Sequence, residues 1–93
     1  LDDLTRRLAA AAPEQREVSL VHGDFHLRNL ITSPESGEIV ATLDWELSTL
    51  GDPLADMGSL LTYWAQPGES LSGDYAPSTL EGFPNRAEMT RLY

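Results

Sequence analysis

The spacing of apolar positions changes along the chain, and each change marks an expected element. Residues 1–11 carry leucines at helical spacing and a run of alanines, so they predict the end of an amphipathic helix. Residues 17–22 alternate between polar and apolar positions and predict a short strand, one face of which holds Val18, Leu20 and His22.

A β-hairpin is expected over residues 29–46. Its first arm is NLIT, its second arm is EIVATLDWE, and Pro34 and Gly37 supply the turn between them. The polar loop GDFHLR precedes the first arm, and the acidic DWE segment ends the second, so the hairpin brings two polar segments together. Residues 48–53 predict another turn.

The C-terminal half predicts two further helices. Residues 52–66 predict a helix of about four turns, which Asp52 caps and Pro53 begins. Residues 67–84 are rich in Gly, Ser and Pro and predict a long loop, after which Asn85 opens the last helix in a capping box. The buried stripe of the helix at 52–66 is expected to be Leu54, Met57, Leu61 and Trp64.

Composition narrows the class of protein. The chain has 93 residues, 41% of them hydrophobic, which suits one small domain or a piece of a larger one. It contains no cysteine, so disulfides, thiolate catalysis and cysteine-based zinc sites are excluded. No apolar run reaches the roughly 18 residues that a membrane span needs, and no signal peptide is visible, so we expect a cytoplasmic protein without a membrane partner.

The net negative charge limits the binding partners that the chain can have. The formal net charge is −9, from 15 acidic and 6 basic residues, and every basic residue is an arginine. Such an acidic surface repels nucleic-acid backbones, so no nucleic-acid partner is expected. An anionic substrate would need a local correction of this field, which a divalent cation supplies.

The densest group of chemistry-bearing residues lies in VHGDFHLRNL, residues 21–30. This stretch contains Asp24 and Asn29, and the predicted hairpin brings Asp44 beside Asn29. Three oxygen donors at one place favour a hard cation such as Mg²⁺ over zinc. A carboxylate near the metal that does not bind it could accept a proton from a hydroxyl, and phosphoryl transfer requires this combination.

Two motifs carry a family resemblance. HGDFHLRN followed by LDWELSTLGDPLADMGSLL resembles the phosphotransferase family of aminoglycoside and choline kinases, small-molecule relatives of the protein kinases. The resemblance covers residues 17–68 and is strongest for the branch related to acyl-CoA dehydrogenase-like proteins. It implies an α+β fold in which residues 1–93 form part of the C-terminal lobe of a protein-kinase-like domain.

The resemblance also implies roles for individual residues. Asp24 would be the catalytic base, while Asn29 and Asp44 would bind Mg²⁺, and Asp44 would bridge the ATP phosphates. His22 would support the catalytic loop from behind, and Asp56 would hydrogen-bond the backbone of that loop. ATP and Mg²⁺ are therefore the expected co-substrate and cofactor.

The sequence departs from the family pattern in two respects. Trp45 and Glu46 replace the Phe-Gly pair of the protein-kinase metal-binding motif, which argues against a mobile switch at this place. The chain also has no GxGxxG loop and no lysine, so the N-terminal lobe that carries them is expected to precede Leu1. The resemblance implies further helices after Tyr93, which usually supply acceptor-binding residues. The fragment alone is expected to be inactive.

Several side chains keep more than one interpretation. His26 contacts substrate or phosphate, or it is an ordinary loop histidine. Arg28 neutralises the acidic cluster or faces solvent, and Glu46 is a further candidate for a substrate or phosphate contact. His22 and His26 have the spacing of HExxH zinc sites, but Gly23 stands where the glutamate would be, which argues against zinc.

Three functions compete at this point. The leading one is transfer of the γ-phosphoryl group of ATP to a small-molecule hydroxyl, for which the branch resemblance suggests a hydroxyacyl compound such as a CoA thioester. A metallophosphoesterase is the alternative, because GDFH is similar to the GD-x-H element of those enzymes, but it needs more than the two histidines present. The third is a non-catalytic kinase-like binding module, against which the retained Asp24, Asn29 and Asp44 argue.

Overall fold

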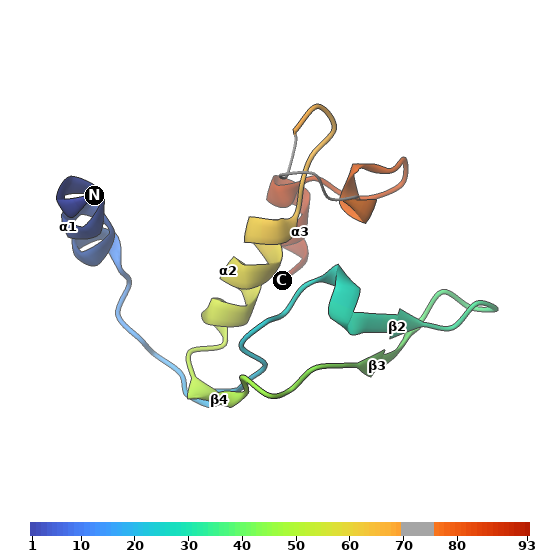
Figure 1. Cartoon of the computed structure of the whole chain (residues 1–93), viewed down its shortest axis with the longest axis horizontal. Helices are drawn as coiled ribbons and strands as arrows, with labels where there is room; N and C mark the ends of the chain where they lie inside the picture. The colour runs from blue at the N-terminus through green and yellow to red at the C-terminus, as the bar shows by residue number, and fades with distance from the viewer. Residues whose placement is uncertain (70–75) are drawn as a thin grey trace.

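The computed structural model describes residues 1–69 and 76–93 and shows a small mixture of helices and sheets (Figure 1). Within these residues, two antiparallel sheets of two strands each pair β1 with β4 and β2 with β3. The elements are α1 (Asp2–Ala11), β1 (Ser19–Val21), η1 (Leu27–Asn29), β2 (Leu30–Thr32), β3 (Ile39–Thr42), β4 (Thr49–Gly51), α2 (Leu54–Tyr63), η2 (Pro77–Thr79) and α3 (Arg86–Leu92).

The predicted first helix is confirmed as α1. Two acidic residues, Asp2 and Asp3, lie in its first turn, where they interact favourably with the helix dipole. The helix stands apart from the rest of the chain at the end of an extended segment (Figure 1). Its apolar stripe is therefore in solvent, and Leu4 and Leu8 are 52% and 62% exposed.

The predicted hairpin is confirmed as β2 and β3, but the predicted length of its second arm is wrong. Strand β3 ends at Thr42 instead of continuing through residue 46. Asp44 has φ of 63°, in the left-handed region, and this conformation cannot continue a strand. One further hydrogen bond extends the pairing, from the Leu43 N–H to the Asn29 carbonyl at 2.7 Å.

The predicted turn at residues 48–53 is wrong, because residues 49–51 form strand β4. This strand pairs with β1, and Leu20 lies opposite Leu50. The expected apolar face of the first strand is also wrong, since Val21 and His22 are buried whereas Leu20 is 64% exposed. Both errors have the same cause: three-residue strands are decided by a partner distant in the sequence rather than by local pattern.

Helix α2 is confirmed but is shorter than predicted. It runs over 10 residues, and Pro53 is its N-cap residue rather than its first helical residue. The Asp52 carboxylate accepts a hydrogen bond from the Leu54 N–H at 2.9 Å, so it still caps the first turn. The buried stripe was predicted only in part, because Leu54 is 52% exposed and Leu60 is the buried residue of the helix.

Trp64, predicted as buried, follows α2 and joins it to the start of α3. Its indole N–H donates to the Pro84 carbonyl at 2.8 Å, and its own carbonyl accepts from Arg86 at 2.8 Å. The predicted loop at 67–84 contains η2, and its residues 70–75 lie outside the described part of the chain. The predicted capping box of α3 is confirmed, since Asn85 and Glu88 exchange both hydrogen bonds.

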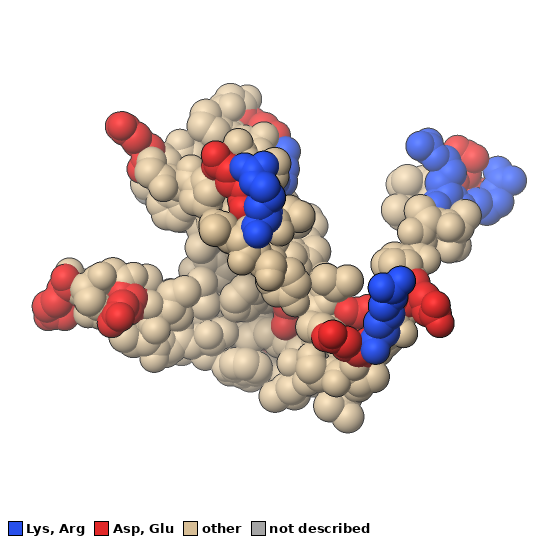
Figure 2. Space-filling model, turned by 180° about the vertical axis from the view of Figure 1, so that it is seen from behind, with Lys and Arg blue, Asp and Glu red and all other residues tan. Residues whose placement is uncertain are grey.

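The overall shape is open. The Cα radius of gyration is 15.1 Å, whereas a compact domain of this length would have about 12 Å. Figure 2 shows charged side chains on the projecting parts and a largely uncharged surface between them.

No helix in the described ranges is long and apolar enough to cross a membrane. The buried hydrophobic residues lie beneath the polar loop and at the end of α2: Val21, Leu60, Trp64 and Ala65.

Candidate functional site

The polar loop between β1 and β2 begins with a sharp turn at Gly23. This residue has φ of +90°, which side chains rarely adopt, and a Cβ atom there would lie 2.5 Å from the Leu47 carbonyl oxygen. The loop backbone therefore passes directly against the segment that follows Asp44. Only glycine satisfies both the conformation and the close approach.

The start of the loop is held by a carboxylate from α2. Asp56 accepts hydrogen bonds from the His22 N–H at 2.7 Å and from the Gly23 N–H at 3.0 Å, one on each oxygen. Asp56 lies in the first turn of α2, where a negative charge also interacts favourably with the helix dipole. Charge-assisted bonds to two successive N–H groups fix the direction of the loop as it leaves β1.

The ring of His22 joins the loop to the segment before Asp44. His22 is 2% exposed, its Nδ1 accepts from the Asp24 N–H at 3.1 Å, and its Nε2 lies 2.6 Å from the Leu43 carbonyl oxygen. Because Nδ1 accepts, Nε2 carries the proton and donates to Leu43. The ring packs against Trp45 with a centroid distance of 4.7 Å. One buried side chain thus sets the spacing between the Asp24 and Asp44 segments.

Asp24, His26 and Asn29 form a cluster at the tip of the loop. His26 Nε2 lies 3.4 Å from Asp24 Oδ1, and the Asn29 amide nitrogen donates to the Asp24 carbonyl at 2.8 Å. The Asp24 side chain is 31% exposed, so solvent or a substrate reaches its carboxylate. The amide nitrogen of Asn29 is used within the loop, which leaves its amide oxygen as the atom suited to a cation.

Asp44 is placed through its neighbour Leu43. The N–H of Leu43 donates to Asn29 and its carbonyl accepts from His22, so both sides of this peptide are fixed. Asp44 follows directly, exposed and with left-handed backbone geometry. A non-glycine residue with positive φ carries strain of about 1–2 kcal/mol, a feature that concentrates at functional sites.

The donor chemistry of Asn29 and Asp44 suits a hard divalent cation. Both offer oxygen ligands, and Mg²⁺ is commonly held by one or two protein ligands together with phosphates and water. No group of three His, Cys, Asp or Glu side chains that could hold a metal occurs in residues 1–69 and 76–93. Asn29 and Asp44 would therefore be the residues to hold a magnesium ion that also binds phosphate and water.

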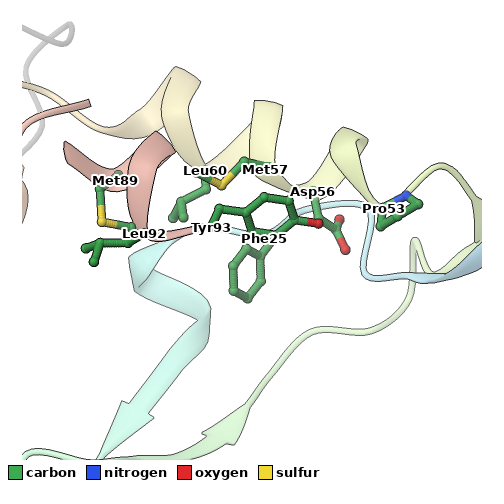
Figure 3. Close-up of a pocket in the computed structure, with 8 residues that line it drawn as sticks. All are labelled: Phe25, Pro53, Asp56, Met57, Leu60, Met89, Leu92 and Tyr93. Atoms are coloured by element: carbon green, nitrogen blue, oxygen red, sulfur yellow. The ribbon is translucent and has the colours of Figure 1, made fainter. Parts of the chain in front are cut away.

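The remaining candidates lie around this cluster. Arg28 is exposed on η1, and Glu46 is exposed after Trp45. Sequence reasoning gave no specific role to two aromatic residues, Phe25 and Tyr63. Phe25 lies in an apolar groove with residues of α2 and α3 (Figure 3), and the Tyr63 ring lies 5.0 Å from the His26 ring. The position of Phe25 directly after Asp24 was the sequence signal that could have indicated its packing against α2 and α3.

Comparison with known proteins decides the family. The model of a family described as "Phosphotransferase enzyme family" matches residues 1–90. The chain belongs to this phosphotransferase family. The family resemblance inferred from the motifs is therefore confirmed. No solved structure matches the chain significantly, so the protein-kinase-like lobe remains a prediction.

The curated relatives of this phosphotransferase-family chain are long proteins. It is 42% identical over 96 residues to "Acyl-CoA dehydrogenase family member 10" of Mus musculus, covering 100% of this chain and 9% of the relative. It is 38% identical over 80 residues to "Acyl-CoA dehydrogenase family member 11" of Homo sapiens, covering 83% of this chain and 10% of the relative. The chain thus spans about a tenth of the length of the relatives it matches.

Proposed function

We propose that this chain forms the catalytic-loop part of a small-molecule kinase that transfers the γ-phosphoryl group of ATP to a hydroxyl. In this proposal the chain lies within the C-terminal lobe of a protein-kinase-like domain. The remainder of the longer protein supplies the lysine and the glycine-rich loop that this sequence lacks. Membership of the phosphotransferase family supports the reaction class.

The observation that carries the proposal is the double attachment of His22. Its ring binds the Asp24 backbone on one side and the Leu43 carbonyl on the other, at 3.1 and 2.6 Å. A carboxylate base and a carboxylate metal ligand are thereby held at a fixed spacing by a buried group. Such preorganisation is what phosphoryl transfer asks of a protein, because catalysis there consists mainly of positioning and charge stabilisation.

Each residue has a defined task in the proposed reaction. The Asp24 carboxylate accepts the proton of the acceptor hydroxyl while the hydroxyl oxygen bonds to the γ-phosphorus. The bond between the γ-phosphorus and the oxygen that links it to the β-phosphate breaks, and ADP leaves. Asn29 and Asp44 hold Mg²⁺, which when bound neutralises charge on the ATP phosphates. Asp56 keeps the loop in place through the His22 and Gly23 amides.

The acceptor is proposed to be a hydroxyacyl compound, for example a hydroxyacyl-CoA. The names of the relatives support this class, since they are called acyl-CoA dehydrogenase family members and are 38–42% identical to this chain where they align. A kinase segment beside acyl-CoA chemistry would act on an acyl chain that carries a hydroxyl. Aminoglycosides, choline and sugars are the acceptors to be compared with it.

The structure also bears on the phosphoesterase alternative. A dinuclear hydrolase would need histidine nitrogens as metal ligands. Both ring nitrogens of His22 are engaged within the chain, and the Nε2 atom of His26 faces Asp24. The engagement of both His22 nitrogens therefore favours the kinase proposal over a dinuclear metal site.

The test is acceptor-dependent ADP formation by the complete protein that contains this chain. The protein is incubated with Mg²⁺ and ATP and with hydroxyacyl-CoA, aminoglycoside, choline or sugar, and Asp24→Asn serves as the blank. Asp3→Asn, an exposed position on α1, is the matched control. We expect ADP formation with a hydroxyacyl acceptor, a loss of at least about 100-fold in Asp24→Asn, and Mg-ATP binding unchanged in that variant.

The outcomes separate the candidate functions. Turnover retained in Asp24→Asn would show that another group is the base. Phosphate release from phosphoesters without ATP would favour the phosphoesterase. Absence of nucleotide binding in the wild-type protein would leave the non-catalytic module.

A further inference from the structure

We propose that Trp45 is a positioning residue that holds Asp44 in its left-handed backbone conformation through a hydrogen bond from the indole ring. This inference rests on the proposed function, because it assigns a residue to the metal ligand Asp44 of that reaction. It gives a task to the tryptophan that stands where the protein-kinase motif has phenylalanine. A phenylalanine ring carries no N–H group and could not make this bond.

The indole hydrogen bond spans Asp44. The Trp45 Nε1–H donates to the Thr42 carbonyl at 2.7 Å, three residues back along the chain. Leu43, which lies within this span, is fixed on both sides, because its N–H and its carbonyl are hydrogen-bonded at 2.7 and 2.6 Å. Asp44 therefore lies between two anchored neighbours, and the indole bond is what anchors the second of them.

The Thr42 carbonyl accepts the indole N–H because it points away from β2. In a trans peptide, the C=O group and the N–H group of the next residue point in opposite directions. The Leu43 N–H points across the sheet to the Asn29 carbonyl, so the Thr42 carbonyl faces the other edge of β3. On that edge β3 pairs with no further strand in the part of the chain that the structure describes. The side chain of Trp45 thus satisfies a carbonyl that the sheet leaves open.

The placement of the Trp45 ring is not explained by burial alone. Trp45 is 47% exposed, and its ring touches His22 with a centroid distance of 4.7 Å. Its carbonyl accepts from the Ser48 N–H at 3.0 Å, so the backbone after Asp44 is also held. A non-glycine residue keeps positive φ only where its surroundings impose it. The indole bond across Asp44 is the side-chain contact suited to impose it here.

The conformation of Asp44 decides where its carboxylate points. An extended residue at this position would continue β3 and direct its side chain elsewhere, because Cβ directions follow the backbone dihedrals. Only molecules with a left-handed Asp44 would present the carboxylate to the proposed metal site. The apparent affinity for a metal–nucleotide complex should therefore depend on the fraction of molecules in that conformation.

The first test measures nucleotide affinity of the complete protein by titration calorimetry, with Mg-ADP and with ADP in EDTA. Trp45→Phe keeps an aromatic ring beside His22 and removes the N–H. We expect it to weaken Mg-ADP binding by about 3- to 10-fold, while binding of metal-free ADP changes by less than about twofold. Thermal unfolding confirms that each variant is folded.

Trp64→Phe is the matched control. It also removes an indole N–H that donates to a backbone carbonyl, that of Pro84 at 2.8 Å, but it does so at the junction of α2 and α3. Both affinities should stay within about twofold of wild type in this variant, because the two tryptophans share no partner. A loss of Mg-ADP affinity in Trp64→Phe equal to that in Trp45→Phe would contradict a specific role of Trp45.

A double-mutant cycle shows whether Trp45 acts through Asp44. In Asp44→Gly the carboxylate is absent and positive φ carries no strain, so the indole bond has nothing left to hold. Adding Trp45→Phe to Asp44→Gly should therefore change Mg-ADP affinity by less than about twofold. A further loss as large as that in the wild-type background would show that Trp45 acts by another route.

A readout without nucleotide separates this proposal from the proposed function. In the complete protein labelled with ¹⁵N-tryptophan, the Trp45 indole N–H is identified by its loss in Trp45→Phe, and its hydrogen exchange with solvent is followed. Asp44→Val should accelerate this exchange at least about fivefold, because β-branched residues disfavour positive φ. Asp44→Asn should leave the exchange rate within about twofold, because asparagine tolerates the left-handed region.

Three results would overturn the proposal. They are an unchanged Mg-ADP affinity in folded Trp45→Phe, an equal loss of affinity with and without Mg²⁺, and equal indole exchange rates in Asp44→Val and Asp44→Asn. The second of these would make Trp45 a nucleotide contact. If the wild-type protein binds no nucleotide but the indole exchange depends on residue 44 as expected, the proposed function fails and the hold of Trp45 on Asp44 stands.

Discussion

At the scale of single residues, the site depends on two backbone positions with positive φ. Gly23 turns the loop at φ of +90°, and Asp44 occupies the left-handed region at φ of 63°. They flank the His22 ring, which connects the loop with the segment before Asp44. Glycine adopts this conformation without strain whereas Asp44 does not, and each position gives a prediction.

Gly23→Ala should destabilise the protein and abolish transfer. The new methyl group would lie 2.5 Å from the Leu47 carbonyl oxygen, so the loop or the facing segment must move. Gly37→Ala is the matched control, because Gly37 also has positive φ but no atom lies within 4 Å of its added Cβ. We expect Gly37→Ala to cost about 1 kcal/mol and Gly23→Ala clearly more, measured by urea unfolding. Equal losses would show that the close approach of residue 23 to Leu47 does not contribute to the free energy of unfolding.

Asp44→Gly should separate stability from binding. Glycine adopts φ of 63° without strain, so the free energy of unfolding should rise by up to about 1 kcal/mol or stay unchanged. The variant lacks the carboxylate, so its affinity for Mg-ADP should fall at least about tenfold, as titration calorimetry would show. Glu35→Gln, which alters an exposed acid in the turn between β2 and β3, is the control. Unchanged affinity in Asp44→Gly would remove Asp44 from the metal site.

At the scale of elements, α2 links the loop to the rest of the chain. Its first turn contributes Asp56 to the loop entrance, and its last residue, Tyr63, lies against the loop tip. The helix thus contacts both ends of the loop that carries Asp24. Neither contact contributes a reacting group, so the helix acts by holding the loop.

Asp56→Asn should loosen the loop without changing any residue of the loop itself. An amide offers one acceptor oxygen, so either the His22 N–H or the Gly23 N–H loses its partner and faces an amide NH₂ group. We expect a loss of about 1.5–3 kcal/mol in the free energy of unfolding and a lower kcat. Asp52→Asn is the control in the same turn, because asparagine caps a helix as well as aspartate does. Similar losses of unfolding free energy in both variants would show that Asp56 does not hold the loop in place.

At the scale of the whole molecule, the described chain is held together by few contacts. Large apolar residues such as Leu20, Leu50 and Val40 are more than 60% exposed. The end of α2 is joined to the start of α3 by Arg86, which binds both oxygens of Glu69 at 2.5 and 2.8 Å. These polar links therefore add to the packing of the buried Trp64 and Ala65 in this region.

The Arg86–Glu69 pair predicts a pH dependence. Hydrogen bonds from Arg86 lower the pKa of Glu69 to about 2, and the Gln66 N–H adds to this effect. A carboxylate whose pKa is lower in the folded state stabilises the fold above its unfolded value near 4.5. This stabilisation should be lost as the pH falls from 4.5 through about 2. Because both side chains are exposed, the effect should also weaken with salt.

The pH prediction can be checked with a matched pair of variants. Glu69→Gln should remove the part of the acid sensitivity between pH 4.5 and about 2, measured as the pH dependence of unfolding. Glu81→Gln, at another exposed acid, should leave that dependence unchanged. A carboxyl titration of Glu69 with its midpoint near the unfolded value would contradict the paired arrangement.

The sequence by itself determined the local features of this protein. The polar loop at 21–30, the turn between β2 and β3, the capping box at Asn85 and the family motifs all follow from neighbouring residues. Their physical causes are turn preference, helix capping and hydrophobic period, which act over a few residues. These signals predicted α1, the hairpin and α3.

Only the tertiary structure decided how those segments meet. The pairing of Leu20 with Leu50 and the bonds from His22 to Leu43 and Asp56 join residues more than 20 positions apart. No local pattern encodes such contacts, because their free energy appears only when the partners come together. The left-handed conformation of Asp44 has the same origin, since fixed contacts at Leu43 hold a residue that would otherwise continue the strand.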